Sequence, residues 1–122
     1  MEVTLNDKQY RLVEDFVATI SDNNQTKLLN DFDLPPAVHE EIRECLENYF
    51  DSTETLTAPP RARQTEITDG ERCLVEAFHM NDGNIGIECV IFANNIPSEA
   101  ILHLELTKNA ENPKLIYKYI GS

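Results

Sequence analysis

The side chains of this sequence that are best suited to chemistry are its three histidines, its three cysteines and its 22 carboxylates. His39-Glu40-Glu41 begins like the helical zinc signature His-Glu-x-x-His, in which two imidazoles on one helical turn bind the metal. The second histidine would have to stand at position 43, which is Arg43. The sequence therefore predicts no metal site, and it predicts no cofactor.

Two further arrangements resemble parts of catalytic sites. His103 and Glu105 alternate along one predicted strand, where a carboxylate can orient an imidazole as a general base. The same pair is also an ordinary neighbour pairing on an exposed strand face. Cys73 or Cys89 with His79 would give a nucleophile and a base, but no flanking signature accompanies them. The glycines lack the spacing of a phosphate-binding loop. We expect a protein that is not an enzyme and whose cysteines are buried and reduced.

The clearest pattern of functional groups is a row of carboxylates in the first half of the chain. Its members recur every three or four residues, which places them along one face of a helix, and Arg43 is the only basic residue within that helix. Such a row is also common on surfaces that contact only water. The predicted partner-binding residues are Glu40, Glu44, Glu47 and Asp51, which form the row, with Glu41, Asp31 and Asp33 beside it.

The charge balance restricts the partners. The 122 residues carry 22 acidic and 10 basic side chains, a formal net charge of -12. Nucleic acids and anionic membranes attract proteins through Lys and Arg, so we expect neither as a partner. Residues 1–57 hold 13 acidic and 4 basic side chains, a net charge of -9, whereas residues 58–122 hold 9 and 6, a net charge of -3. We therefore expect a basic partner, with the acidic helix face and the sheet as the two candidate interfaces.

The N-terminal half has helical periodicity. Apolar residues recur at helical spacing over 6–21, where Asn6 or Thr4 can cap the start and a Ser-Asp-Asn-Asn cluster ends the helix. A short helix is predicted at 26–30. A second long helix opens at the Pro35-Pro36 pair, because proline in the first helical turn costs no hydrogen bond.

The C-terminal half has the two-residue periodicity of apolar and polar side chains that is typical of β-strands. Residues 51–63 are expected to form a connecting loop and 64–67 a weak edge strand. Tyr117 and Tyr119 are expected to share one face of the last strand. Strands joined in sequence by short turns form consecutive hairpins, which make an antiparallel meander. The remaining strands are predicted at 73–80, 85–92, 100–107 and 115–120, with turns at 81–84, 94–97 and 109–113.

These patterns predict a single α+β domain over 1–122, with a helical part at 1–57 and an antiparallel sheet at 58–122. The first residues have neither the basic start nor the apolar run of a secretory signal. No segment approaches the roughly 20 apolar residues of a membrane span. We therefore expect a cytoplasmic protein. The sequence does not indicate its oligomeric state.

Helices, a loop with the Pro59-Pro60 pair and a curved antiparallel sheet follow one another along the chain. This order resembles the cone-shaped NTF2-like fold and the related cystatin-like roll, over most of the chain. The resemblance implies two or three helices packed on a curved meander of four or five strands. The small size, strong acidity and lack of a catalytic signature are also similar to the immunity proteins that bacteria pair with toxins of contact-dependent growth inhibition systems.

Two functions follow from these observations. The first is an immunity or inhibitor protein that neutralises a basic toxin, such as a nuclease, through the carboxylate row. The second, implied by the NTF2-like resemblance, is a small-ligand binder or enzyme with a pocket between helices and sheet. Its polar groups would be His79, His103, Glu88 or Glu105. A structural role, with the last strand as an edge contact, is a third alternative.

Overall fold

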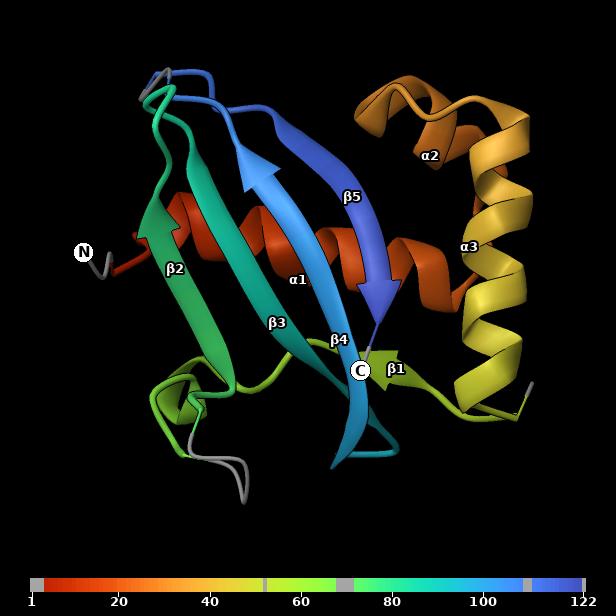
Figure 1. The fold of residues 1–122 in the computed structure, drawn as a ribbon. Helices are drawn as coiled ribbons and strands as arrows, with labels where there is room; N and C mark the ends of the chain where they lie inside the picture. The colour runs from red at the N-terminus through yellow and green to blue at the C-terminus, as the bar shows by residue number, and fades with distance from the viewer. Residues whose placement is uncertain (1–3, 52, 68–71, 109–110, 122) are drawn as a thin grey trace.

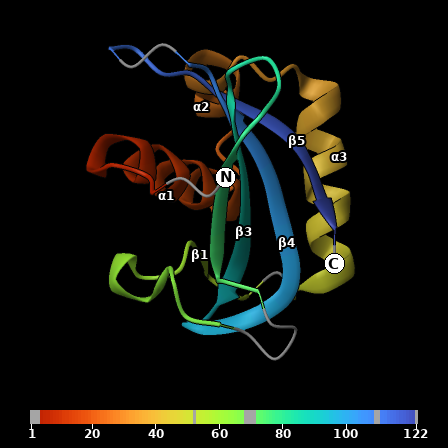
Figure 2. The same ribbon diagram turned by 60° about the vertical axis from the view of Figure 1, so that its left-hand side comes forward.

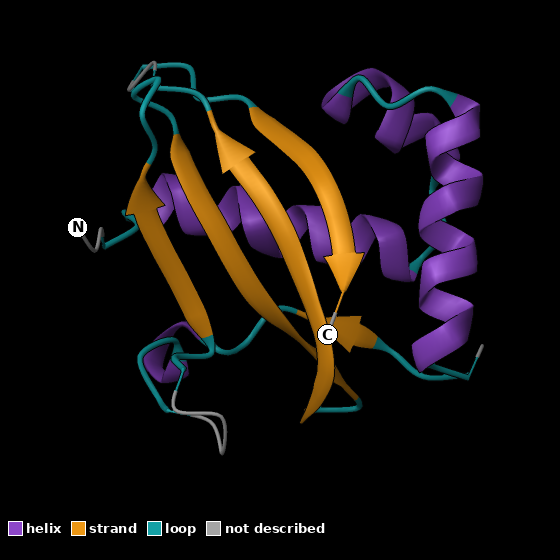
Figure 3. Ribbon diagram, viewed as in Figure 1, coloured by secondary structure: helices purple, strands orange, loops and turns teal. Residues whose placement is uncertain are grey.

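The fold is known from a computed structural model, which describes residues 4–51, 53–67, 72–108 and 111–121. This part of the chain forms three α-helices followed by an antiparallel sheet of five strands, an α+β arrangement (Figures 1 and 3). The elements are α1 (Asp7–Ser21), α2 (Gln25–Phe32), α3 (Pro36–Tyr49), β1 (Leu56–Thr57), the 3₁₀ helix η1 (Arg61–Arg63), β2 (Val75–His79), β3 (Ile85–Ala93), β4 (Ile96–Leu106) and β5 (Leu115–Gly121).

The helices begin within one residue of the positions that their sequences predict. Asn6 caps α1 in a capping box: its side chain accepts a hydrogen bond from the backbone of Gln9, whose side chain accepts one from the backbone of Asn6. Asn24 caps α2 in a similar way. Asp33 ends α2 in the left-handed conformation, with φ of 54°. The predicted short helix is therefore present and extends through Phe32.

The sheet is the predicted meander with one addition. Strands β2 to β5 pair consecutively and antiparallel, and β1 pairs with the end of β3, where Leu56 lies opposite Ala93. The loop predicted over 51–63 therefore contains a short strand. Asn94 and Asn95, both at positive φ, make a two-residue hairpin turn, so β4 begins already at Ile96.

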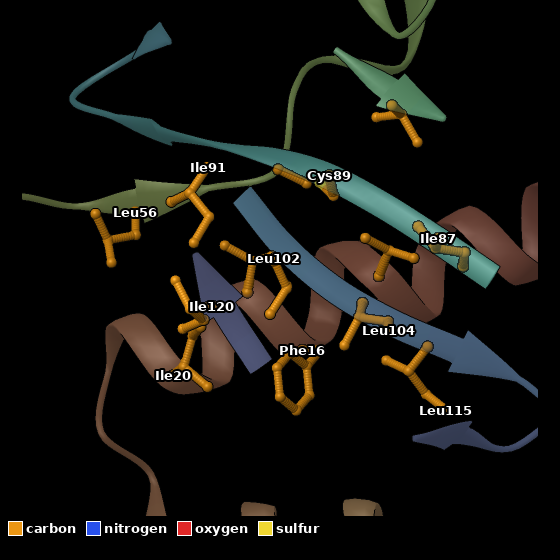
Figure 4. Packing of buried hydrophobic residues seen from close by; sticks show 14 of the residues in the cluster. Phe16, Ile20, Leu56, Ile87, Cys89, Ile91, Leu102, Leu104, Leu115 and Ile120 are labelled. Carbon is orange, nitrogen blue, oxygen red and sulfur yellow. The ribbon is translucent and has the colours of Figure 1, made fainter. Parts of the chain in front are cut away.

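Helix α1 crosses one face of the sheet, while α3 lies beside β5 (Figure 1). The turned view confirms that α1 packs on a single side of the strands (Figure 2). Between α1 and the sheet, the apolar side chains of α1 interdigitate with those of the inner sheet face (Figure 4). Figure 4 labels Phe16, Ile20, Leu56, Ile87, Cys89, Ile91, Leu102, Leu104, Leu115 and Ile120 among the buried residues.

No helix of the described chain covers the other sheet face, which is turned toward the viewer in Figure 1. One end of this face carries a second small apolar cluster of Leu74, Val90 and Phe92, where the Arg63 guanidinium lies over the Phe92 ring at 5.2 Å. The predicted strand at 64–67 is wrong, because only Ile67 bridges to Cys73 and the rest of that segment turns. This second cluster explains why β3 is apolar on both faces.

A bulge in β5 overturns the expectation that Tyr117 and Tyr119 share a face. Tyr117 lies opposite Leu104 and Tyr119 opposite His103, so Lys118 is an extra residue without a counterpart on β4. Tyr117 consequently points inward and Tyr119 outward. The Tyr117 ring stacks on Phe16 with centroids 5.9 Å apart, whereas the side chain of Tyr119 lies on the open sheet face.

Candidate functional site

The predicted carboxylate row lies on the outer face of α3. Ile42 and His39 are buried on the inner side of this helix, while Glu40, Glu44 and Glu47 are exposed on the outer side. The three carboxylates recur over seven residues, or about 10 Å of helix at 1.5 Å per residue. We call these three residues the acidic face.

The structure corrects the position of Asp51. The helix ends at Tyr49, and Phe50 has an extended backbone with φ of -137° and ψ of 151°, which turns its ring toward the core. Asp51 therefore lies in the following turn, where its backbone N–H donates to Glu54 Oε1 at 2.9 Å. The helical periodicity that placed Asp51 in the row stops two residues before it.

Basic residues neutralise only part of the acidic face. Arg43 lies 3.8 Å from the Glu40 carboxylate and 4.0 Å from that of Glu47, whose side chains remain 73% and 70% exposed. Contacts this long and this exposed contribute little to stability. Glu44 forms no ion pair with the described residues, and the same holds for Glu41. The acidic face therefore keeps an uncompensated negative charge toward solvent.

The other predicted contact residues lie on α2 and at its end. Asp31 is exposed in the last turn of α2, and Asp33 follows directly as the helix cap. The Asp33 carboxylate pairs with Lys114, which begins the approach to β5. Sequence spacing brings Asp31 and Asp33 near α3, but the Lys114 contact reduces the negative charge available there.

A pocket next to the acidic face was not predicted. We call it the α3 pocket; it has a volume of about 220 Å³ and lies where α3 meets α2, the end of α1 and β1. Its apolar wall includes Leu28, Leu46 and Phe50. Its charged residues are Arg43, Glu47, Asp51 and Glu54. These side chains come from elements that are distant in sequence. The one local signal of the pocket was the apolar Phe50 directly before Asp51.

The polar residues proposed for a ligand pocket lie away from the helices. His103 and Glu88 face the open side of the sheet, with His103 Nδ1 3.8 Å from a Glu88 carboxylate oxygen. Arg72 pairs with Glu88 on the same face. Glu105, whose side chain is 11% exposed, pairs with Lys118 at 3.2 Å. The space between sheet and helices is instead filled by the apolar core, and His79 is exposed at the end of β2.

The pKa of His103 is lowered from its ordinary value by desolvation. The imidazole stacks on the Tyr119 ring with centroids 4.0 Å apart, which removes water from one of its faces. The nearby Glu88 carboxylate opposes the shift, and Arg72 adds to it. His103 therefore favours its neutral form at neutral pH.

This shift makes stability depend on pH. The pKa of His103 is lower in the folded protein than in the unfolded chain. As the pH falls below about 6.5, the unfolded chain therefore binds more protons than the folded protein does, and the free energy of unfolding decreases. We expect the His103→Gln variant to lose less stability than the parent protein between pH 7.5 and pH 5.5. Urea unfolding at the two pH values measures this difference; equal losses in both proteins would contradict it.

Cys89 does not form a nucleophilic pair with His79. Cys89 is fully buried on the inner face, and burial raises the pKa of its thiol to about 12. It lies opposite Val75, four residues along β2 from His79 and therefore about 13 Å away. All three cysteines are free thiols; Cys45 and Cys73 are only partly buried.

His39 has a structural role in the described fold. Its ring is buried, and Nε2 lies 2.5 Å from the backbone carbonyl oxygen of Leu34, which ties the start of α3 to the preceding turn. Among the described residues, no group of three or more His, Cys, Asp or Glu side chains is arranged to hold a metal ion. Within the same residues no helix has the length and apolarity to cross a bilayer.

Comparisons with known proteins give this chain no family: no family model, no curated protein and no solved structure matches it. The site must therefore be interpreted from its own residues. Two features distinguish it, namely the acidic face of α3 and the adjoining α3 pocket.

Proposed function

We propose that this protein is an inhibitor that binds a basic protein through the acidic face of α3. The partner class we propose is a nuclease-type toxin, for which this chain would serve as the immunity protein. That role would place the protein in the cytoplasm, where it would protect its own cell. It requires no catalytic group in this chain.

The observation that carries the proposal is the row of exposed carboxylates Glu40, Glu44 and Glu47 on one helix face, which the single guanidinium of Arg43 neutralises only in part. A nuclease must hold phosphates, so its cleft gathers Lys and Arg side chains. A row of carboxylates is attracted to the same cations and raises the rate of encounter. An inhibitor seated on the cleft blocks the substrate without any chemistry of its own.

Calorimetric titration against the purified protein from the adjacent gene tests this function. We expect saturable binding, and inhibition of the partner's nuclease activity at equal molar amounts. Because exposed charges are screened within about 8 Å at 0.15 M salt, we expect the Kd to rise at least about tenfold between ~20 mM and ~300 mM salt. No binding at the lower salt would remove the proposal; binding without salt dependence would remove the role of the acidic face.

A further inference from the structure

We propose that the α3 pocket receives one apolar side chain of the basic partner, and that this side chain has Lys or Arg beside it in the partner's sequence. The inference rests on the proposed function, since it names the feature of the partner that the same surface recognises. The pocket adjoins the acidic face directly, because Glu47 belongs to both. One occupant can therefore engage the pocket and the face together.

The size and wall of the pocket fit a single side chain. Leu28 and Ile42 are 2% exposed and Leu56 is 4% exposed, so these side chains form a fixed wall. A cavity of about 150 Å³ lined by Leu, Ile and Phe is sufficient to bind benzene. The α3 pocket, at about 220 Å³, can therefore hold a phenyl or isobutyl group. It is smaller than the roughly 300–1,000 Å³ of typical small-molecule sites.

The charges at the pocket select cations beside that side chain. Glu47, Asp51 and Glu54 supply three carboxylates, and Arg43 supplies the one guanidinium. Glu54 is held in place because its Oε1 accepts the backbone N–H of Asp51. A partner residue that enters the pocket brings its sequence neighbours against this negative rim. Lys or Arg at those positions meets attraction, whereas Asp or Glu meets repulsion.

Small probes test the pocket without the partner. We would titrate the full chain with 2-phenylethylammonium, with neutral 2-phenylethanol and with anionic 3-phenylpropionate, and follow backbone amide shifts by two-dimensional NMR. We expect the shifts to cluster at Leu46, Phe50 and Leu56, and the cation to bind at least about tenfold more tightly than the anion. Equal binding of cation and anion, or shifts located elsewhere, would overturn the inference.

Two variants locate the effect. Leu46→Trp, at a half-buried pocket position, should fill the pocket and abolish the shifts, while Leu29→Trp, at a position on α2 that is 49% exposed, should leave them. The triple variant Glu47→Gln, Asp51→Asn, Glu54→Gln keeps hydrogen-bond acceptors but removes charge. Because the Arg43 guanidinium remains at the pocket, this variant should bind the anion at least as tightly as the cation. Persistence of the cation preference in that variant would place the site elsewhere.

The partner separates this inference from the proposed function. We expect Leu46→Trp to raise the Kd for the basic partner at least about tenfold. If Glu44→Lys weakens the partner but Leu46→Trp does not, the function stands and the pocket inference fails. If the probes bind as expected but the adjacent protein does not bind, the proposed function fails and the pocket remains a site for an apolar group next to a cation.

Discussion

Replacement of Phe16 by alanine is expected to lower the free energy of unfolding by about 3–5 kcal/mol, the usual cost of removing a buried aromatic ring. Phe16 is 1% exposed and lies at the centre of the core. Its ring meets Phe32 of α2 edge-to-face at 5.0 Å and stacks on Tyr117 of β5 at 5.9 Å. The substitution therefore loosens α1, α2 and the sheet at once.

Urea denaturation measures this effect, and Leu29→Ala is the matched control. Leu29 is also an apolar helix residue but is 49% exposed, so its truncation should change stability by no more than about 0.5 kcal/mol. Both variants should unfold with the slope of the parent protein, because they expose the same surface. A loss below about 1 kcal/mol for Phe16→Ala would mean that the three rings are not packed as described.

Elements governed by local chemistry could be predicted from the sequence. The start of α1 depends on Asn6 and Gln9, which cap the backbone three residues apart. Gly83 adopts a φ of 91° in the first hairpin turn, a conformation that glycine adopts without strain. These signals lie within a few residues of the structure they specify. The starts of the helices and the order of the hairpins in the meander therefore follow from periodicity and turn residues.

Elements governed by distant pairing could not be predicted. Strand β1 has only two residues, Leu56 and Thr57, and it forms because they pair with Ala93 and Phe92 at the end of β3. The bulge at Lys118 leaves the alternating pattern of β5 intact in sequence, so nothing local indicates that Tyr117 and Tyr119 lie on opposite faces. Both features depend on a neighbouring strand and not on the residues themselves.

The candidate site likewise has one feature that the sequence predicts and others that it does not. The exposure of Glu40, Glu44 and Glu47 follows from the helical spacing of α3, and it was predictable. The end of that helix was not, because the packing of Phe50 against the core moves Asp51 off the row. The same turn brings Asp51 to the α3 pocket, whose other walls come from α1, α2 and β1. A cavity between elements has no signature in any one of them.

Charge reversal on the acidic face is expected to have the largest effect on partner binding. A carboxylate and a cation about 6 Å apart in water attract by ~0.7 kcal/mol, and reversing one charge replaces this by an equal repulsion. The net change of ~1.4 kcal/mol is about tenfold in Kd. We therefore expect Glu44→Lys to weaken binding about tenfold at low salt, and Glu44→Lys with Glu47→Lys about a hundredfold.

Stopped-flow association rates distinguish a local contact from the general effect of net charge. Glu14→Lys makes the same change of charge at another exposed helix position, on α1. If the acidic face is the contact, the Glu44→Lys variant should associate much more slowly than Glu14→Lys, and the difference should shrink as salt rises. If the two variants slow association equally, the partner responds only to the total charge of -12, and the interface lies on a different surface of the protein.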